Sequence, residues 1–237
     1  MLTLLLIAAE KAELAGILSR CRNIRKTDGK IRFAGEAEWR GNRLLFAANG
    51  PGPQLAGQAV DMAFGEMGMV RVDAIINTGL CGALDPALAV NGIFAASRVM
   101  GENGEPAFDA SLPSCSQPFT SGWMISTDRF VGTREAKAAL HAKGASAVEM
   151  EALGVAAIAA AQKIPFYCIR AVSDNADDGF DMDFNQLRDA SGRFDLPRIV
   201  LHAMARPSRR FPELLKLKRN SESAAKALGE FFDHCRF

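Results

Sequence analysis

Short hydrophobic runs alternate along most of the chain with longer segments of helical periodicity. Apolar runs of strand length occupy residues 2–9, 72–78, 93–100 and 165–172. Between them, apolar residues recur at helical spacing at residues 12–20, 54–68, 133–142 and 151–162. This alternation predicts a three-layer α/β fold, with a central mixed, mostly parallel sheet flanked by helices.

Several shorter segments complete the predicted order of elements. Residues 31–39 and 43–48 predict a hairpin joined by the turn Arg40-Gly41-Asn42, and residues 123–127 and 145–148 predict two more strands. Residues 101–122, rich in Gly, Pro and Ser, predict a loop. We expect one domain over residues 1–237, with a helical tail at about 197–237 that holds two helices at most.

The composition narrows the class of protein. It is 49% hydrophobic and 23% charged, typical of a soluble globular chain, and its net charge of +1 gives no general attraction to nucleic acid. None of the five cysteines shows zinc-ligand spacing, so we expect reduced, packed thiols in a cytoplasmic protein. The apolar N-terminal run lacks a basic leader and is too short to span a bilayer, which favours a buried strand.

Polar residues gather where three predicted strands end. They are Asn77-Thr78-Gly79, Glu149-Met150-Glu151 and Ser173-Asp174. In α/β sheets, ligands bind beyond the carboxyl ends of strands, so we expect these segments to converge. The three histidines lie in helix-like segments elsewhere, which argues against a Ser-His-Asp triad, and the glycine fingerprint of a dehydrogenase is absent. What remains is acid–base chemistry by carboxylates, the type that cleaves glycosidic bonds.

Four segments then resemble one family in order and spacing. IINTGLCGAL (75–84), ISTDRFV (125–131), AVEMEALGVA (147–156) and IPFYCIRAVSDNAD (164–177) are similar to the nucleoside phosphorylase and nucleosidase superfamily. The resemblance covers roughly residues 1–190. It implies a purine nucleoside phosphorylase-like fold, cleavage of the bond between a purine and ribose, and no metal or organic cofactor. It also implies a homo-oligomer, dimeric or higher, and a small purine nucleoside as the molecule that the protein binds.

The resemblance assigns roles residue by residue. Asp174 would protonate or hydrogen-bond the purine N7, which requires a carboxyl group that keeps its proton, as burial favours. Glu151, Met150 and Glu149 would hold the ribose, although Glu149 equally suits the start of the following helix. The base would meet Phe130, Val131 and Ser173, and Phe184 would line the pocket of a 5′ substituent. A water-activating acid follows the first strand, where Glu13 fits better than Glu10.

The nucleophile stays open between water and phosphate. Related phosphorylases place an arginine and a hydroxyl residue where this chain has Asn77 and Leu80, and neither of these replaces the lost phosphate ligands. Inorganic phosphate as co-substrate could still bind near Thr78 and Gly79. The missing ligands also permit a protein that binds adenine nucleosides without turnover.

The tail adds two expectations. Residues 194–231 resemble the hopanoid-associated phosphorylase subgroup, which implies release of adenine from adenosylhopane. Six basic residues also cluster there against the single acid Glu213, with leucines between them; they are Arg206, Arg209, Arg210, Lys216, Lys218 and Arg219. Such a stretch suits peripheral contact with an anionic membrane, and equally a solvated helix face.

Overall fold

A ten-stranded mixed sheet forms the centre of the computed structural model, which describes residues 1–27, 29, 31–66, 71–104 and 106–237. Nine of its strands follow the order β10-β9-β6-β11-β5-β1-β4-β3-β2, and β7 pairs beside β6. The strands are β1 (Thr3–Ala8), β2 (Arg22–Lys26), β3 (Phe33–Trp39), β4 (Asn42–Ala48), β5 (Ala74–Ala83), β6 (Ile93–Gly101), β7 (Ala107–Asp109), β8 (Ser114–Cys115), β9 (Thr120–Ser126), β10 (Ala147–Glu149), β11 (Phe166–Asp174) and β12 (Cys235–Arg236). The helices are α1 (Lys11–Leu18), α2 (Pro53–Glu66), α3 (Arg134–His141), α4 (Ala152–Gln162), the short 3-10 helix η1 (Phe184–Leu187), α5 (Leu196–Met204) and α6 (Pro207–Phe232).

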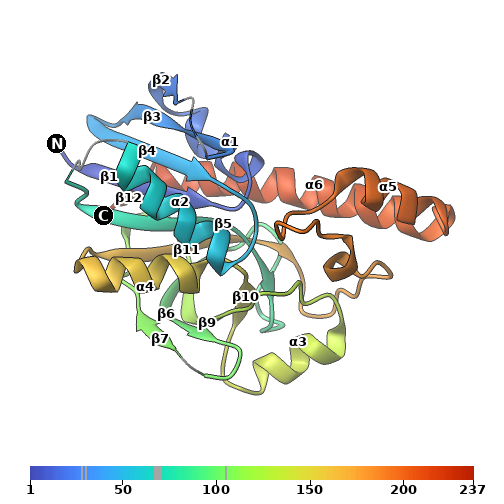
Figure 1. Ribbon diagram of the computed structural model, residues 1–237. Helices are drawn as coiled ribbons and strands as arrows, with labels where there is room; N and C mark the ends of the chain where they lie inside the picture. The colour runs from blue at the N-terminus through green and yellow to red at the C-terminus, as the bar shows by residue number, and fades with distance from the viewer. Residues whose placement is uncertain (28, 30, 67–70, 105) are drawn as a thin grey trace.

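Helices cover both faces of the sheet (Figure 1). On one face α2 and α4 pack together over a core that includes Ile75, Val155 and Cys168. On the other face α1 and α6 pack together over Leu6 and Ile169. Each central strand therefore buries both of its faces, which is why β1, β5 and β11 are near-continuous apolar runs in the sequence.

The sheet closes on itself at one end. Strand β10 runs parallel to β9 and also pairs antiparallel with β5, with Val148 opposite Gly82. The ring β5-β11-β6-β9-β10 brings the end of β10 beside the last residues of β5 and β11. This closure brings Glu149-Met150-Glu151 and Ser173-Asp174 around one space with the last residues of β5.

The hydrophobic pattern places most elements correctly, and the exceptions have physical causes. The segment at residues 101–122 is not all loop, because it contains β7, β8 and the start of β9. Strand β2 was not expected, since all five of its residues are exposed and carry no apolar alternation. Strand β5 continues past Gly79 to Ala83. Of the helix expected at residues 54–68, the last two residues lie outside the described part of the chain.

The expectation of five reduced cysteines is wrong for two of them. Cys115 on β8 and Cys235 on β12 form a disulfide, with their Cα atoms 4.2 Å apart. Their 120-residue separation in sequence gives no signal of the pairing. Cys21, Cys81 and Cys168 are free thiols, and burial raises the pKa of Cys168 to about 12. Within the described ranges, no helix combines the length and apolarity needed to cross a membrane.

Candidate active site

The polar strand ends surround a cavity of about 420 Å³. Its inner part is lined by acids and small residues from the ends of β5, β10 and β11 and from the start of α1; they include Glu10, Glu13, Leu80, Gly82, Glu149, Met150, Glu151, Ser173 and Asp174. Its outer part is apolar and is lined by Phe130, Phe184, Phe194, Leu196, Ile199, Leu214 and Leu217. Two of the three predicted segments, Glu149-Met150-Glu151 and Ser173-Asp174, therefore line one cavity, which has one polar end and one apolar end.

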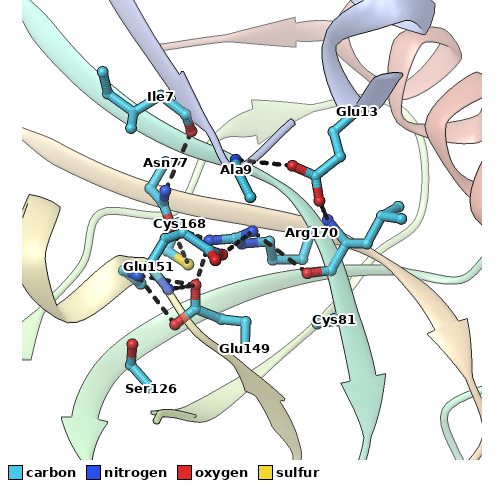
Figure 2. Close-up of polar contacts among 12 residues, drawn as sticks. Ile7, Ala9, Glu13, Asn77, Cys81, Ser126, Glu149, Glu151, Cys168 and Arg170 are labelled. Carbon is cyan, nitrogen blue, oxygen red and sulfur yellow. Dashed lines mark hydrogen bonds and ion pairs between the residues drawn. The ribbon is translucent and has the colours of Figure 1, made fainter. Parts of the chain in front are cut away.

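A buried arginine lies at the centre of the polar end (Figure 2). Arg170 comes from the middle of β11, is fully buried, and forms ion pairs with both Glu149 and Glu151. Its Nη2 atom also donates to the side-chain oxygen of Asn77. These carboxylates raise the pKa of the guanidinium, so it stays charged. Arg170 thereby fixes the two acids of the Glu-Met-Glu segment against the sheet.

Glu149 and Glu151 use their remaining hydrogen bonds differently. Glu149 accepts hydrogen bonds from the backbone N–H groups of Glu151 and Ala152, at 2.8 and 2.9 Å, and so satisfies the start of α4. Glu151 accepts one from the N–H of Gly52 at 3.2 Å, and its other oxygen lies 3.2 Å from Nη1 of Arg170. Glu149 therefore has the structural role that the helix start offers, and both carboxylates border the cavity.

Glu13 is held by backbone groups of two elements. Its carboxylate accepts hydrogen bonds from the N–H groups of Ala9 and Glu10, at 2.9 and 3.0 Å, and from Leu80 at 3.2 Å. Gly79 adopts a φ of +137°, and a Cβ there would lie 2.9 Å from the Glu13 carboxyl group. Burial raises the pKa of Glu13, and the charge of Arg170 partly opposes that effect. Glu10 instead pairs with Arg32 at 3.0 Å on the exposed side.

The crowding of acids changes the titration of Glu151. Burial raises its pKa to about 8, with Arg170 lowering it and the charges of Glu149 and Glu13 raising it further. One guanidinium cannot compensate three nearby carboxylates, so one of them keeps its proton near neutral pH.

This shift predicts how stability depends on pH. Because the pKa of Glu151 is 4.5 when unperturbed and about 8 in the folded protein, the folded state binds more protons between about pH 5 and pH 8. Stability from this group is thus present below the lower value and is lost as the pH rises through the upper one. Between about pH 5 and pH 8, the free energy of unfolding of Glu151→Gln, which cannot titrate, should fall by at least about 1 kcal/mol less than that of wild type. Urea unfolding of both proteins at the two ends of this pH range measures the difference. Exposed Glu222→Gln is the control, and parallel curves for Glu151→Gln and wild type would contradict the assignment.

Asp174 has a cationic partner that the sequence does not reveal. Its Oδ2 atom lies 2.5 Å from Nζ of Lys137, which comes from α3 and is 1% exposed. Its Oδ1 atom accepts a hydrogen bond from the Ser173 hydroxyl at 2.7 Å. Lys137 also donates to the backbone oxygen of Asn175 at 2.6 Å. The burial expected around Asp174 is present, and it comes with a buried ammonium group in direct contact with the carboxyl group.

Aromatic residues form the wall beside Asp174. Phe130 packs edge-to-face against Phe180 and Phe184, with ring centroids 5.2 and 5.0 Å apart. Val131 is buried and borders the cavity with Phe130, and the backbone of Phe130 exchanges two hydrogen bonds with Asn185. The residues predicted for the base and for the 5′ substituent therefore share one wall.

The predicted phosphate region does not border the cavity. Thr78 is fully buried and Gly79 packs against Arg170, so Leu80, Cys81 and Gly82 line the space in their place. Asn77 donates to the backbone oxygen of Ile7 at 3.2 Å and accepts from Arg170. The prediction fails because β5 continues past Gly79, so that these residues lie within the sheet instead of beyond its edge.

Sequence reasoning missed Arg170 and Lys137. Arg170 carries a detectable signal, since it is the single charge between Phe166 and Val172 in a strand expected to be covered on both faces. Lys137 carries a weaker one, because it lies three positions before buried Leu140 on the inner face of α3.

The sequence is similar to known proteins over part of its length. Residues 114–203 match the sequence profile of the phosphorylase superfamily. A 5′-methylthioadenosine/S-adenosylhomocysteine nucleosidase of Staphylococcus epidermidis is 28% identical over 144 residues, which are 49% of this chain and 63% of that protein. The chain thus covers less than two thirds of this relative's length.

Solved structures share the fold over nearly the whole chain. The 5′-methylthioadenosine/S-adenosylhomocysteine nucleosidase of Neisseria meningitidis, in complex with methylthio-immucillin-A, has a TM-score of 0.70 and 23% identity, covering 98% of this chain and 99% of its own. A mutant futalosine hydrolase of Helicobacter pylori has a TM-score of 0.72 and 16% identity, covering 98% and 97%. The predicted α/β fold is confirmed.

Proposed function

We propose that this chain, whose residues 114–203 match the sequence profile of the phosphorylase superfamily, hydrolyses the N-glycosidic bond of a 5′-substituted purine nucleoside, releasing adenine. The observation that carries this proposal is the pairing of two sets of groups across one cavity. Asp174 with Lys137 lies at the end of β11, and Glu13 with Glu151 lies around Arg170. The first set suits a departing base, and the second suits a sugar and its nucleophile.

Departure of the base needs a proton at the purine N7. Asp174 borders the cavity and lies within 2.5 Å of the Lys137 ammonium, which can pass a proton through Oδ2. As the bond between the anomeric carbon and the base breaks, the base accepts this proton and leaves as a neutral molecule. Lys137 then regains a proton from solvent.

The sugar and the water belong to the opposite set. Glu151 would accept hydrogen bonds from the ribose hydroxyls, and Met150 would pack on the ribose face. The nearby carboxylates favour positive charge at the anomeric carbon in an oxocarbenium-like transition state. Glu13, whose pKa burial raises, would take a proton from the attacking water, whose oxygen then bonds to that carbon.

Water is favoured over phosphate by the charges around the sugar. Glu13, Glu149 and Glu151 together outnumber the buried guanidinium of Arg170, so an added phosphate would meet net negative charge. The cations that line the cavity, among the described residues, are Arg129 and Lys218. Arg129 forms an ion pair with Glu102, and Lys218 is exposed on α6.

The outer wall of the cavity suits an apolar 5′ substituent. Phenylalanines and leucines line it. They come from different elements, with Phe184 on η1 and Leu217 on α6. A large hydrocarbon group gains free energy by leaving water for such a surface. Adenosylhopane, which the tail resemblance suggests, carries a substituent of this kind.

The proposal is tested by incubating the protein with adenosine, methylthioadenosine, adenosylhomocysteine and an adenosine with an alkyl 5′ substituent. Each is assayed with and without inorganic phosphate, and adenine release is measured. We expect release at the same rate in both conditions, fastest with the apolar substituents. Release that depended wholly on phosphate would replace hydrolysis by phosphorolysis.

The role of Lys137 can be tested separately. Lys137→Met should lower kcat by about tenfold to a hundredfold, because Asp174 loses its proton source, and should change KM little, because Lys137 does not line the cavity. Steady-state adenine release measures both constants. Lys143→Met, on the exposed end of the same region, is the matched control. An unchanged kcat in Lys137→Met would remove the proposed proton transfer.

A further inference from the structure

Helix α5 is apolar on two sides. Ile199 and Ala203 are buried and pack with Met182, Phe184 and Leu187 against the body of the protein. Val200 and Met204, four residues apart on the other side, are 51% and 62% exposed. A helix on a globular surface ordinarily presents polar residues to solvent, so the outer side of α5 is built for contact with something apolar.

The exposed apolar residues extend from α5 onto α6. Among the described residues, six of the large hydrophobic side chains that are exposed fall between positions 196 and 215; they are Leu196, Val200, Leu201, Met204, Phe211 and Leu215. We name this set the α5/α6 face. Figure 1 shows α5 beside the first part of α6, at the end of the molecule opposite the two chain termini.

Positive charge surrounds this face. Arg198, Arg206, Arg209, Lys216, Lys218 and Arg219 are exposed along α5 and the first half of α6, against the single acid Glu213 of the same stretch. Ion pairs compensate part of this charge. Asp181 is shared between Arg206 and buried Arg210, at 3.3 and 2.9 Å, and Asp195, Asp178 and Glu222 pair with Arg198, Lys216 and Lys218. Among the described residues, Arg209 and Arg219 form no such pair and leave a positive excess. The chain as a whole carries only +1, so the excess is local to this face.

We propose that the α5/α6 face docks on the surface of an anionic lipid bilayer. Apolar side chains between basic residues match such a surface, because the former enter the acyl boundary while the latter contact lipid phosphates. A second copy of the chain fits the face less well. A twofold contact through it would bring the basic residues of one copy, such as Arg206 and Arg209, against those of the other.

Docking would place the cavity mouth at the lipid. Leu196 belongs to the exposed face and also lines the cavity, together with Ile199, Leu214 and Leu217 from the same two helices. A nucleoside anchored in the bilayer by an apolar substituent would then reach Asp174 and Glu13 without crossing water. This consequence rests on the proposed function, whereas the docking itself does not.

Co-sedimentation of the full chain with vesicles tests the proposal. We expect binding to vesicles of equal parts phosphatidylglycerol and phosphatidylcholine, weak binding to phosphatidylcholine alone, and loss of binding at high salt. Arg206→Glu with Arg209→Glu should weaken binding to the anionic vesicles by at least about tenfold. Leu201→Ser with Met204→Ser should weaken it comparably, and both residues are exposed enough for the fold to persist.

Matched controls change the same residue types elsewhere. Arg22→Glu with Lys26→Glu alters the exposed strand β2, and Leu112→Ser removes an exposed leucine distant in sequence from the face. Both should bind vesicles as wild type does. Adenine release from methylthioadenosine should be unchanged in all variants, which separates docking from catalysis. Equal binding by wild type and the α5/α6 variants would overturn the proposal. It would also be overturned if the wild-type chain did not bind vesicles but formed dimers that the α5/α6 variants abolish.

Discussion

Replacing Asp174 by asparagine should lower kcat for adenine release by about a thousandfold, with KM staying within about twofold of wild type. Asparagine keeps the shape of the side chain, and its single amide oxygen can accept one of the two hydrogen bonds that Asp174 receives from Lys137 and Ser173. It cannot carry a proton to the purine N7, so the base must leave as an anion. Because the proton is transferred only as the bond breaks, the loss falls on kcat and leaves substrate binding intact.

Asp178→Asn is the matched control for this substitution. Asp178 lies four residues further on, pairs with Lys216 at 2.7 Å and does not line the cavity, so kcat should stay within about twofold. Wild-type kcat in Asp174→Asn would contradict the assigned acid. Absence of turnover in wild type and variant alike would instead favour a protein that binds adenine nucleosides without cleaving them.

Replacing Arg170 by methionine destabilises the fold by about 3–5 kcal/mol. Methionine fills much of the same volume, but it leaves Glu149 and Glu151 buried without their shared cation. This loss is a large part of the stability of an ordinary domain. The deficit should shrink as the pH falls, because protonation removes the uncompensated negative charge. Urea unfolding at several pH values measures both effects.

Arg43→Met provides the comparison for a pair at the surface. Arg43 binds Glu36 at 2.7 Å, but its side chain is 37% exposed, so its removal should cost no more than about 1 kcal/mol. If Arg170→Met costs no more than Arg43→Met at every pH, then Arg170 does not hold the acids of the site together.

The fold was largely predictable because burial leaves a pattern in the sequence. Strands β1, β5 and β11 are covered on both faces, so each is a near-continuous apolar run. Strands β2, β7 and β8 were not predicted, because each is short or exposed. They are defined by pairing with a neighbouring strand and not by burial. The register that pairs β10 with β5 depends on contacts across 64 residues, from Ala83 to Ala147, and leaves no local signal.

The site was predictable at its edges and not at its centre. Glu13, Glu151 and Asp174 lie at or shortly after the ends of β1, β10 and β11, so the rule that ligands meet strand ends brings them to one cavity. Lys137 reaches Asp174 from a helix 37 residues earlier, and Arg170 lies inside a strand, where the pattern predicts only core. Neither partner can be paired with its acid until the chain is folded. Thr78 and Gly79 were misplaced because the end of β5 lies further along the chain than its apolar run suggests.

The central claim is that water attacks the sugar while Asp174 assists the departing adenine. Running the reaction in water enriched in heavy oxygen, with phosphate present, and weighing the released sugar by mass spectrometry tests it most directly. The account predicts one heavy oxygen in the free sugar and an unlabelled adenine. A sugar phosphate whose oxygens come from the added phosphate would contradict it.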